Sequence, residues 1–247
     1  MQVIIKTVDD QYHCLRPFMH LWRKFFTCYT PSEIQPSVDL VVCGYGVPDF
    51  ELFPWRFHSL GNREDYPPHK WSDATIKILD NVADDVFIFM LEDYWLCRPV
   101  DVRGIGFLFD YARQFENVLK IDLAFDRLYM HAGATFGCGA NTYDYVGHLD
   151  LIKSPHGTPY QMSLWGGIWR RDVMRRFVIP GESAQQLELS GTPRVTEDVL
   201  VLGTRQAPLL HGNIYASGRG KTPAYSDNGW AIPEAEVKYM RGKGWIE

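Results

Sequence analysis

The chain has 247 residues but few cysteines, and those few show no pattern. No two have the C-x-x-C spacing of a zinc or redox motif, and their number is odd. This excludes a small disulfide-stapled scaffold and predicts reduced thiols in a cytoplasmic protein. The five are Cys14, Cys28, Cys43, Cys97 and Cys138.

Long apolar runs and an excess of positive charge are also missing. Asp9 and Asp10 interrupt the N-terminus before an apolar run forms, so no signal peptide is expected. No stretch reaches the roughly 18 apolar residues that a membrane span needs. The net charge of −5 argues against a generic nucleic-acid binder, because such proteins present a positive surface to phosphates.

The residues that are present indicate one well-packed domain over residues 1–247. Apolar residues make up 46% of the chain, enough for a large core. The aromatic share of 14% is high, with 8 Trp, 13 Tyr and 14 Phe. Such side chains fill cores and also form the walls of sites for flat or ring-shaped ligands.

The first 95 residues alternate short β-branched runs with amphipathic stretches. The pattern predicts strands at 3–5, 39–43, 57–60 and 86–91 and helices at 15–26 and 71–79, with Ser72 as an N-cap. This order is typical of an α/β fold with a mainly parallel sheet flanked by helices. Polar residues follow the strands at their carboxyl ends, where open α/β sheets bind ligands.

The pattern changes after residue 95. It predicts a helix at 105–115, a strand at 118–123, a loop or hairpin at 135–147 and a basic helix at 170–177. Earlier in the chain, a linker is predicted at 31–36. Aromatic residues and glycines fill the stretch 160–169. The last forty or so residues carry many glycines and prolines with little periodicity, which favours an ordered tail or lid.

Two adjacent carboxylates, Glu92 and Asp93, end the most apolar strand of the chain. A buried, unpaired acid costs several kcal/mol, so both side chains are expected at an open edge or in ion pairs. Hard oxygen ligands at a strand end suit Mg²⁺ or Mn²⁺ carrying a diphosphate. A polar loop that merely follows a core strand is the alternative.

A strand that ends in Leu91-Glu92-Asp93, downstream of the opening strand Val3-Ile4-Ile5-Lys6-Thr7, resembles the acidic motif of nucleotide-sugar glycosyltransferases of the GT-A fold. The chain is most similar to the compact single-domain transferases of bacteria and phages. The resemblance implies a nucleotide-binding half at 1–95, an acceptor and catalytic half at 96–209 and a C-terminal tail or lid at 210–247.

The resemblance assigns the donor nucleotide to the loop after the first strand, Thr7, Val8 and Asp9, and to Asp73 on the helix before the acidic strand. It assigns a divalent ion to Glu92 and Asp93. Tyr94 stands where many members have a second acid, so the metal is expected to be weakly held or to be used only with nucleotide present. The late His211 would complete the metal shell, and Arg219 and Lys221 would close on the diphosphate. An exposed basic turn is the alternative for these last two.

An inverting transferase needs a base that deprotonates the acceptor hydroxyl. The resemblance favours Glu188 for this role, followed by Glu182 and then by the pair Glu197 and Asp198. A solvated acidic turn is the competing interpretation for each of these acids. We predict inversion of the anomeric configuration because a candidate base is present.

The stretch 160–169 is expected to form the floor of a sugar pocket or, alternatively, a core strand with two packing tryptophans. Its glycines let the backbone approach a ligand closely. The assigned residues are Gln161, Ser163, Trp165, Gly166, Gly167 and Trp169. The resemblance adds Asp122, Asp126 and Arg127 beside the donor sugar, although Asp126 and Arg127 can also pair with each other.

The sequence therefore predicts a glycosyltransferase that uses a UDP-sugar or a similar donor with Mn²⁺ or Mg²⁺. The acceptor would be a glycan, a small molecule or a modified base of phage DNA. Trp22-Arg23-Lys24 and Trp169-Arg170-Arg171 mix aromatic and basic residues as a DNA groove does. A sugar nucleotidyltransferase is less favoured, because Thr7-Val8-Asp9-Asp10 is not a glycine-rich basic loop. A non-catalytic carbohydrate-binding protein is the third hypothesis.

Overall fold

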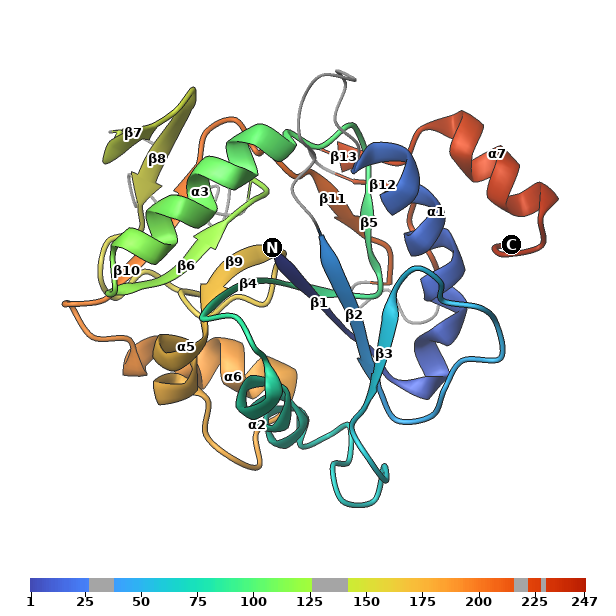
Figure 1. The fold of residues 1–247 in the computed structure, drawn as a ribbon, viewed down its shortest axis with the longest axis horizontal. Helices are drawn as coiled ribbons and strands as arrows, with labels where there is room; N and C mark the ends of the chain where they lie inside the picture. Colours follow the sequence, from blue (N-terminus) through green and yellow to red (C-terminus); the bar gives the residue numbers. More distant parts are fainter. Residues whose placement is uncertain (27–37, 126–141, 216–221, 228–229) are drawn as a thin grey trace.

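The computed structural model describes residues 1–26, 38–125, 142–215, 222–227 and 230–247 (Figure 1). Within these ranges, nine strands form one sheet in the order β3-β2-β1-β4-β9-β6-β10-β8-β7. They are β1 (Gln2–Lys6), β2 (Asp39–Gly44), β3 (Arg56–Ser59), β4 (Val86–Leu91), β6 (Val118–Asp122), β7 (Asp144–Val146), β8 (Leu149–Lys153), β9 (Gly167–Arg170) and β10 (Leu200–Thr204).

The sheet is mixed but largely parallel. Strands β3, β2, β1 and β4 are parallel neighbours, and β6 is parallel to β10. Strand β9 runs antiparallel between β4 and β6, and β8 runs antiparallel to β10 and β7. The carboxyl ends of β1, β2, β4 and β6 therefore meet the beginning of β9 at one edge. This confirms the predicted α/β class.

Helices cover both faces of the sheet (Figure 1). Helices α1 (Leu15–Phe25) and α3 (Val102–Gln114) lie on one face, and α7 (Glu234–Gly242) packs beside α1. Helices α2 (Trp71–Asn81), α5 (Arg171–Phe177) and α6 (Ala184–Gly191) lie on the other. No helix in the described ranges is long and apolar enough to cross a membrane.

Strand β4 shows how the sequence builds both cores. Ile88 and Met90 point into the cluster under α1 and α3, whereas Phe87 and Phe89 point into the cluster under α2, α5 and α6. Side chains alternate along a strand, so a strand covered on both faces needs a continuous apolar run. Each fully buried side chain of this size contributes about 1.5–3 kcal/mol.

A second, two-stranded sheet lies beyond the carboxyl end of β4. In it β5 (Tyr94–Leu96) pairs antiparallel with β11 (His211–Asn213). A third pair joins β12 (Ser226–Asp227) to β13 (Trp230–Ala231). The chain from residue 210 thereby returns to the acidic pair that follows β4.

Several local predictions need correction. Helix α7 lies in the stretch that showed little periodicity. The N-cap of α2 is Lys70, and the Ser72 hydroxyl accepts a bond from the Glu182 amide instead. Of the loop or hairpin predicted at 135–147, the described part contains β7, which pairs with β8 beyond the predicted range. Residues 135–141 and the linker at 31–36 lie outside the described residues. Within the described ranges Cys14, Cys43 and Cys97 are free thiols, as predicted.

Candidate functional site

The loops that follow β1 and β2 are tied together at the carboxyl edge of the sheet. Asp9 Oδ1 accepts a hydrogen bond from the Gly46 amide at 3.1 Å, and the Tyr12 hydroxyl donates to the Gly46 carbonyl. A Cβ on Gly44 would lie 2.6 Å from the Tyr12 oxygen and 3.2 Å from Thr7, so a side chain there would displace the Tyr12 hydroxyl. Thr7 is buried and Val8 is half-buried. The predicted donor loop is therefore a fixed structure.

The predicted donor residue Asp73 is engaged within the protein. Its Oδ1 accepts from the Gly181 amide at 2.7 Å, which ties α2 to the loop before α6. Beside it, the buried ammonium of Lys6 donates to the Trp71 carbonyl at 2.7 Å and lies 3.3 Å above the Trp71 ring. Burial holds the pKa of Lys6 well below its usual range, although the nearby Glu92 charge opposes this shift.

The acidic pair occupies the turn between β4 and β5. Glu92 is 8% exposed, and burial, followed by the charge of Asp93, raises its pKa well above the usual range. Burial also raises the pKa of Asp93 to about 6, although the amides of Asp93 and Tyr215 donate to this carboxylate and oppose the shift. A cation bound beside these two acids would favour their ionised forms.

The donor set of this turn fits Mg²⁺ or Mn²⁺ that shares its coordination with phosphate and water. Both ions prefer carboxylate oxygens, and Mg²⁺ commonly binds through one or two carboxylates plus substrate phosphates. The described ranges contain no group of three or more acidic, histidine or cysteine side chains arranged around a metal position. The acidic turn supplies two carboxylates, Glu92 and Asp93.

His211 lies beside this turn but uses its Nε2 atom elsewhere. The ring stacks on Tyr94 at 4.6 Å and lies 5.1 Å from the Trp165 ring. Nε2 accepts a hydrogen bond from the Gly166 amide at 3.2 Å, and burial lowers the pKa of His211 to about 3. The ring is therefore neutral with its proton on Nδ1. A metal could reach Nε2 only if the Gly166 amide moved away.

A buried ion pair joins Lys120 and Asp122 on β6, and both side chains are 0% exposed. Lys120 Nζ also donates to the Ser163 carbonyl at 2.6 Å and lies 4.9 Å from the Trp169 ring. Sequence reasoning selected Asp122 but missed Lys120. The signal was the two opposite charges at alternate positions of an apolar strand, which places both on one face of the sheet.

The two acids considered as the base have different surroundings. Glu188 on α6 accepts a bond from the Leu164 amide through Oε1 at 2.7 Å. Burial raises the pKa of Glu188, while the Leu164 amide and the charge of Lys120 act in the opposite direction. Glu182 instead forms a two-pronged ion pair with Arg194, at 3.1 and 2.8 Å.

The third candidate base lies at the opposite edge of the sheet. Glu197 and Asp198 are exposed and precede β10, which runs parallel to β6. They are therefore separated from the carboxyl edge by the length of the strand. This position excludes them from the site around Glu188.

The stretch 160–169 leads into β9 from the site. Gln161 is buried and donates to the Pro155 carbonyl at 3.0 Å, and Ser163 is fully buried. Trp165 is half-buried, whereas Trp169 is fully enclosed in the core. Of the two tryptophans, only Trp165 is placed to contact a ligand. Asp126, Arg127, Arg219 and Lys221 lie outside the described residues.

The prediction that Trp22 and Trp169 could stack on bases in a DNA groove is wrong. Trp22 is 5% exposed and Trp169 is 0% exposed, so neither can stack on a base. Arg170 is buried and donates to the Ala112 and Arg113 carbonyls. Trp22 and Trp169 therefore pack in the core, and Arg170 binds the C-terminal end of α3.

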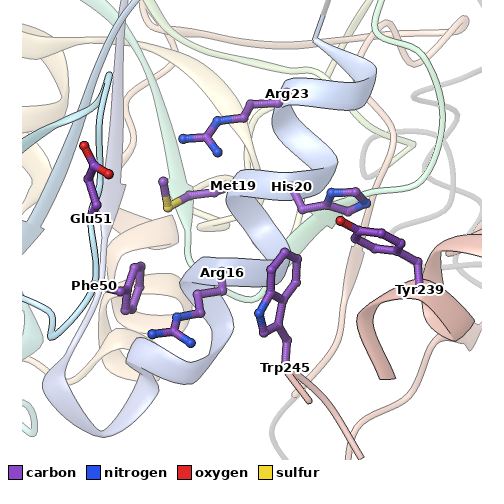
Figure 2. Close-up of a pocket in the computed structure, with 8 residues that line it drawn as sticks. All are labelled: Arg16, Met19, His20, Arg23, Phe50, Glu51, Tyr239 and Trp245. Atoms are coloured by element: carbon purple, nitrogen blue, oxygen red, sulfur yellow. The ribbon is translucent and has the colours of Figure 1, made fainter. Parts of the chain in front are cut away.

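A separate crevice of about 370 Å³ lies between α1 and the C-terminal segment, as Figure 2 shows. An adjoining cavity of about 310 Å³ includes His13, whose ring packs edge-on against Tyr215 at 5.3 Å. Both positively charged guanidinium groups and a negatively charged carboxylate line the crevice. Its lining therefore favours neither an anionic nor a cationic ligand. The lining residues are Arg16, Met19, His20, Arg23, Phe50, Glu51, Tyr239 and Trp245.

No protein-family model and no curated protein matches this chain. Among solved structures, a glucosyl-3-phosphoglycerate synthase from Mycobacterium tuberculosis with Mn²⁺ and UDP-glucose has 14% identity and a TM-score of 0.45, over 86% of this chain and 70% of that one. CMP:2-keto-3-deoxy-manno-octonic acid synthetase with CTP has 14% identity and a TM-score of 0.40, over 76% and 81%.

The same mycobacterial synthase with Mg²⁺ and UDP has a TM-score of 0.38 at 14% identity, over 69% of this chain and 56% of that one. In this match and in another to the same enzyme, the chain spans about half the length of the synthase, 56% and 55%. The similarity is thus to nucleotide-binding α/β enzymes of two reaction types. TM-scores below 0.5 do not carry the activity of either protein over to this chain.

Proposed function

We propose that this protein transfers a sugar from a nucleotide-diphosphate sugar, most simply a UDP-sugar, to an acceptor hydroxyl with inversion. One observation carries the proposal. The acidic pair Glu92 and Asp93, the buried Asp122, and the segment that Glu188 contacts all gather at the carboxyl edge of one sheet. Ligands of open α/β sheets bind at this edge.

The donor side is supported by the fixed loops after β1 and β2 and by the acidic turn. Glu92 and Asp93 would hold Mn²⁺ or Mg²⁺, which supplies charge neutralisation for the diphosphate when bound. Asp9 and Thr7 would border the nucleoside. Arg219 and Lys221, which lie outside the described residues, would supply cations to the departing diphosphate.

The acceptor side is supported by Glu188. Its Oε1 is held by the Leu164 amide, and Oε2 would take the proton from the acceptor hydroxyl. The acceptor oxygen then forms a bond to the anomeric carbon as the bond to the diphosphate oxygen breaks, so the configuration inverts. Burial raises the pKa of Glu188, which makes this carboxylate a stronger base than an exposed one. Trp165 would stack on a sugar face.

The test is sugar transfer or donor hydrolysis with Mn²⁺ present, measured on wild type, Glu188→Gln and the matched control Glu197→Gln. Glutamine cannot accept the proton, so E188Q is expected to lose about 10²- to 10⁴-fold in rate and still bind the donor. E197Q replaces an exposed glutamate at the opposite edge and is expected to match wild type. Donor binding is followed as a rise in melting temperature.

Two results would overturn the proposal. One is a wild-type protein that neither binds nor turns over any UDP-, GDP-, CMP- or dTDP-sugar with Mn²⁺. The other is E188Q with full activity. Release of pyrophosphate from a nucleoside triphosphate and a sugar phosphate would instead identify a nucleotidyltransferase. Product with the anomeric configuration of the donor would exclude inversion.

A further inference from the structure

One peptide group connects two charged side chains on opposite sides of the segment 163–164. Lys120 Nζ donates to the Ser163 carbonyl at 2.6 Å, and the Leu164 amide donates to Glu188 Oε1 at 2.7 Å. The carbonyl of Ser163 and the amide of Leu164 are the two ends of a single peptide bond. The ammonium and the carboxylate are therefore linked by consecutive hydrogen bonds through one polarisable group.

We propose that Lys120 is a positioning residue that acts on the Glu188 carboxylate through the Ser163–Leu164 peptide. This inference rests on the proposed role of Glu188 as the base. A cation at the carbonyl end withdraws electron density and strengthens the amide as a donor, so consecutive hydrogen bonds reinforce each other. The bond to Oε1 then fixes the carboxylate in direction and favours its ionised form.

The surroundings of Lys120 hold its ammonium in place. The side chain is 0% exposed, and its ion pair with Asp122 lies on the same strand. Gly167 opposes Asp122 on β9, and a Cβ there would lie 2.7 Å from Lys120 Cε. Burying a lysine costs free energy. This cost is offset by the partner acid and the carbonyl, and the glycine leaves room for the side chain.

Charged groups on the elements that pack against α6 are engaged elsewhere. Helix α6 packs against α2 and against the 3₁₀ turn at Thr192–Arg194. Arg194 pairs with Glu182, Asp73 accepts from the Gly181 amide, Lys77 donates to the Leu60 carbonyl, and Asp80 pairs with Arg175. Lys120 is accordingly the charge that opposes the effect of burial on the pKa of Glu188.

The experiment compares wild type with Lys120→Met and with the control Lys153→Met, which removes an exposed lysine from β8. The readout is the pH at which the Glu188 carboxyl carbon titrates, followed by ¹³C NMR on labelled protein without substrate and assigned with E188Q. K120M is expected to move this midpoint up by about one to two pH units, because an opposite charge is lost. K153M is expected to leave it unchanged.

The acid limb of the transfer rate should move in the same direction in K120M. A loss of rate with an unmoved midpoint would overturn the proposal and leave Lys120 a purely structural residue. If K120M does not fold, the titration is read in Lys120→Met with Asp122→Asn, which leaves no unpaired acid, and an unmoved midpoint there overturns it too. Because the titration needs no turnover, it separates failure of this inference from failure of the proposed transferase activity.

Discussion

Replacing Asp93 by asparagine should make the metal-free protein more stable at neutral pH. Burial raises the pKa of Asp93 to about 6, against an ordinary value of 3.8. A carboxyl whose pKa is higher in the folded state contributes stability that is present below pH 3.8. That contribution is lost as the pH rises through about 6. Asparagine is neutral at every pH and does not lose it.

The size of the effect follows from the shift. Each pKa unit corresponds to 1.36 kcal/mol, so a shift from 3.8 to about 6 gives about 3 kcal/mol at pH 7.5. Removing the Asp93 charge also relieves the neighbouring Glu92, which acts in the same direction. The gain in D93N should therefore be about 3 kcal/mol or somewhat more at pH 7.5, and it should vanish toward pH 4.

The assay is urea unfolding of wild type and D93N with a chelator at pH 4, 5.5 and 7.5. Asp172→Asn, which replaces an exposed aspartate on α5, is the control and should change stability by a few tenths of a kcal/mol at most. Adding Mn²⁺ with UDP should stabilise wild type and leave D93N largely unaffected. A D93N protein less stable than wild type at pH 7.5, or a difference that does not depend on pH, would refute the reasoning.

Two further substitutions test the neighbourhood of the site. Gly166→Ala places a Cβ 2.9 Å from His211 Nε2, so it should cost about 1–3 kcal/mol in urea unfolding, whereas Gly106→Ala, with open space around it, should cost nothing. A harmless G166A would show that His211 can move aside. Arg194→Met leaves the buried carboxylate of Glu182 unpaired and should destabilise the fold by about 3 kcal/mol. If R194M abolished transfer with unchanged stability, Glu182 would replace Glu188 as the candidate base.

Strands β1 to β4 and β6 were predictable because they are explicit in the sequence, whereas β8 and β10 were not predicted. Strand β4 is a continuous apolar run, which only a strand buried on both faces requires, and its acidic end indicates the edge where it emerges. Helix α7 was missed because its buried face is small, with Glu236 among its buried residues. That glutamate is stabilised by Lys24 and His20 on α1, a partnership that no local pattern records.

Lys120 shows why a site is harder to predict than a strand. A lysine in a strand usually indicates an exposed edge, so the pattern alone favours a solvated side chain. Here the strand lies inside the sheet, and the charge is stabilised by Asp122 and by the Ser163 carbonyl, from a segment far along the chain. The cost of burying Lys120 is thus offset by groups that the site itself places there. Because burying this ammonium is costly, we expect it to have a function. The Glu188 carboxylate, which is hydrogen-bonded to the other end of the same peptide group, is the group on which it would act.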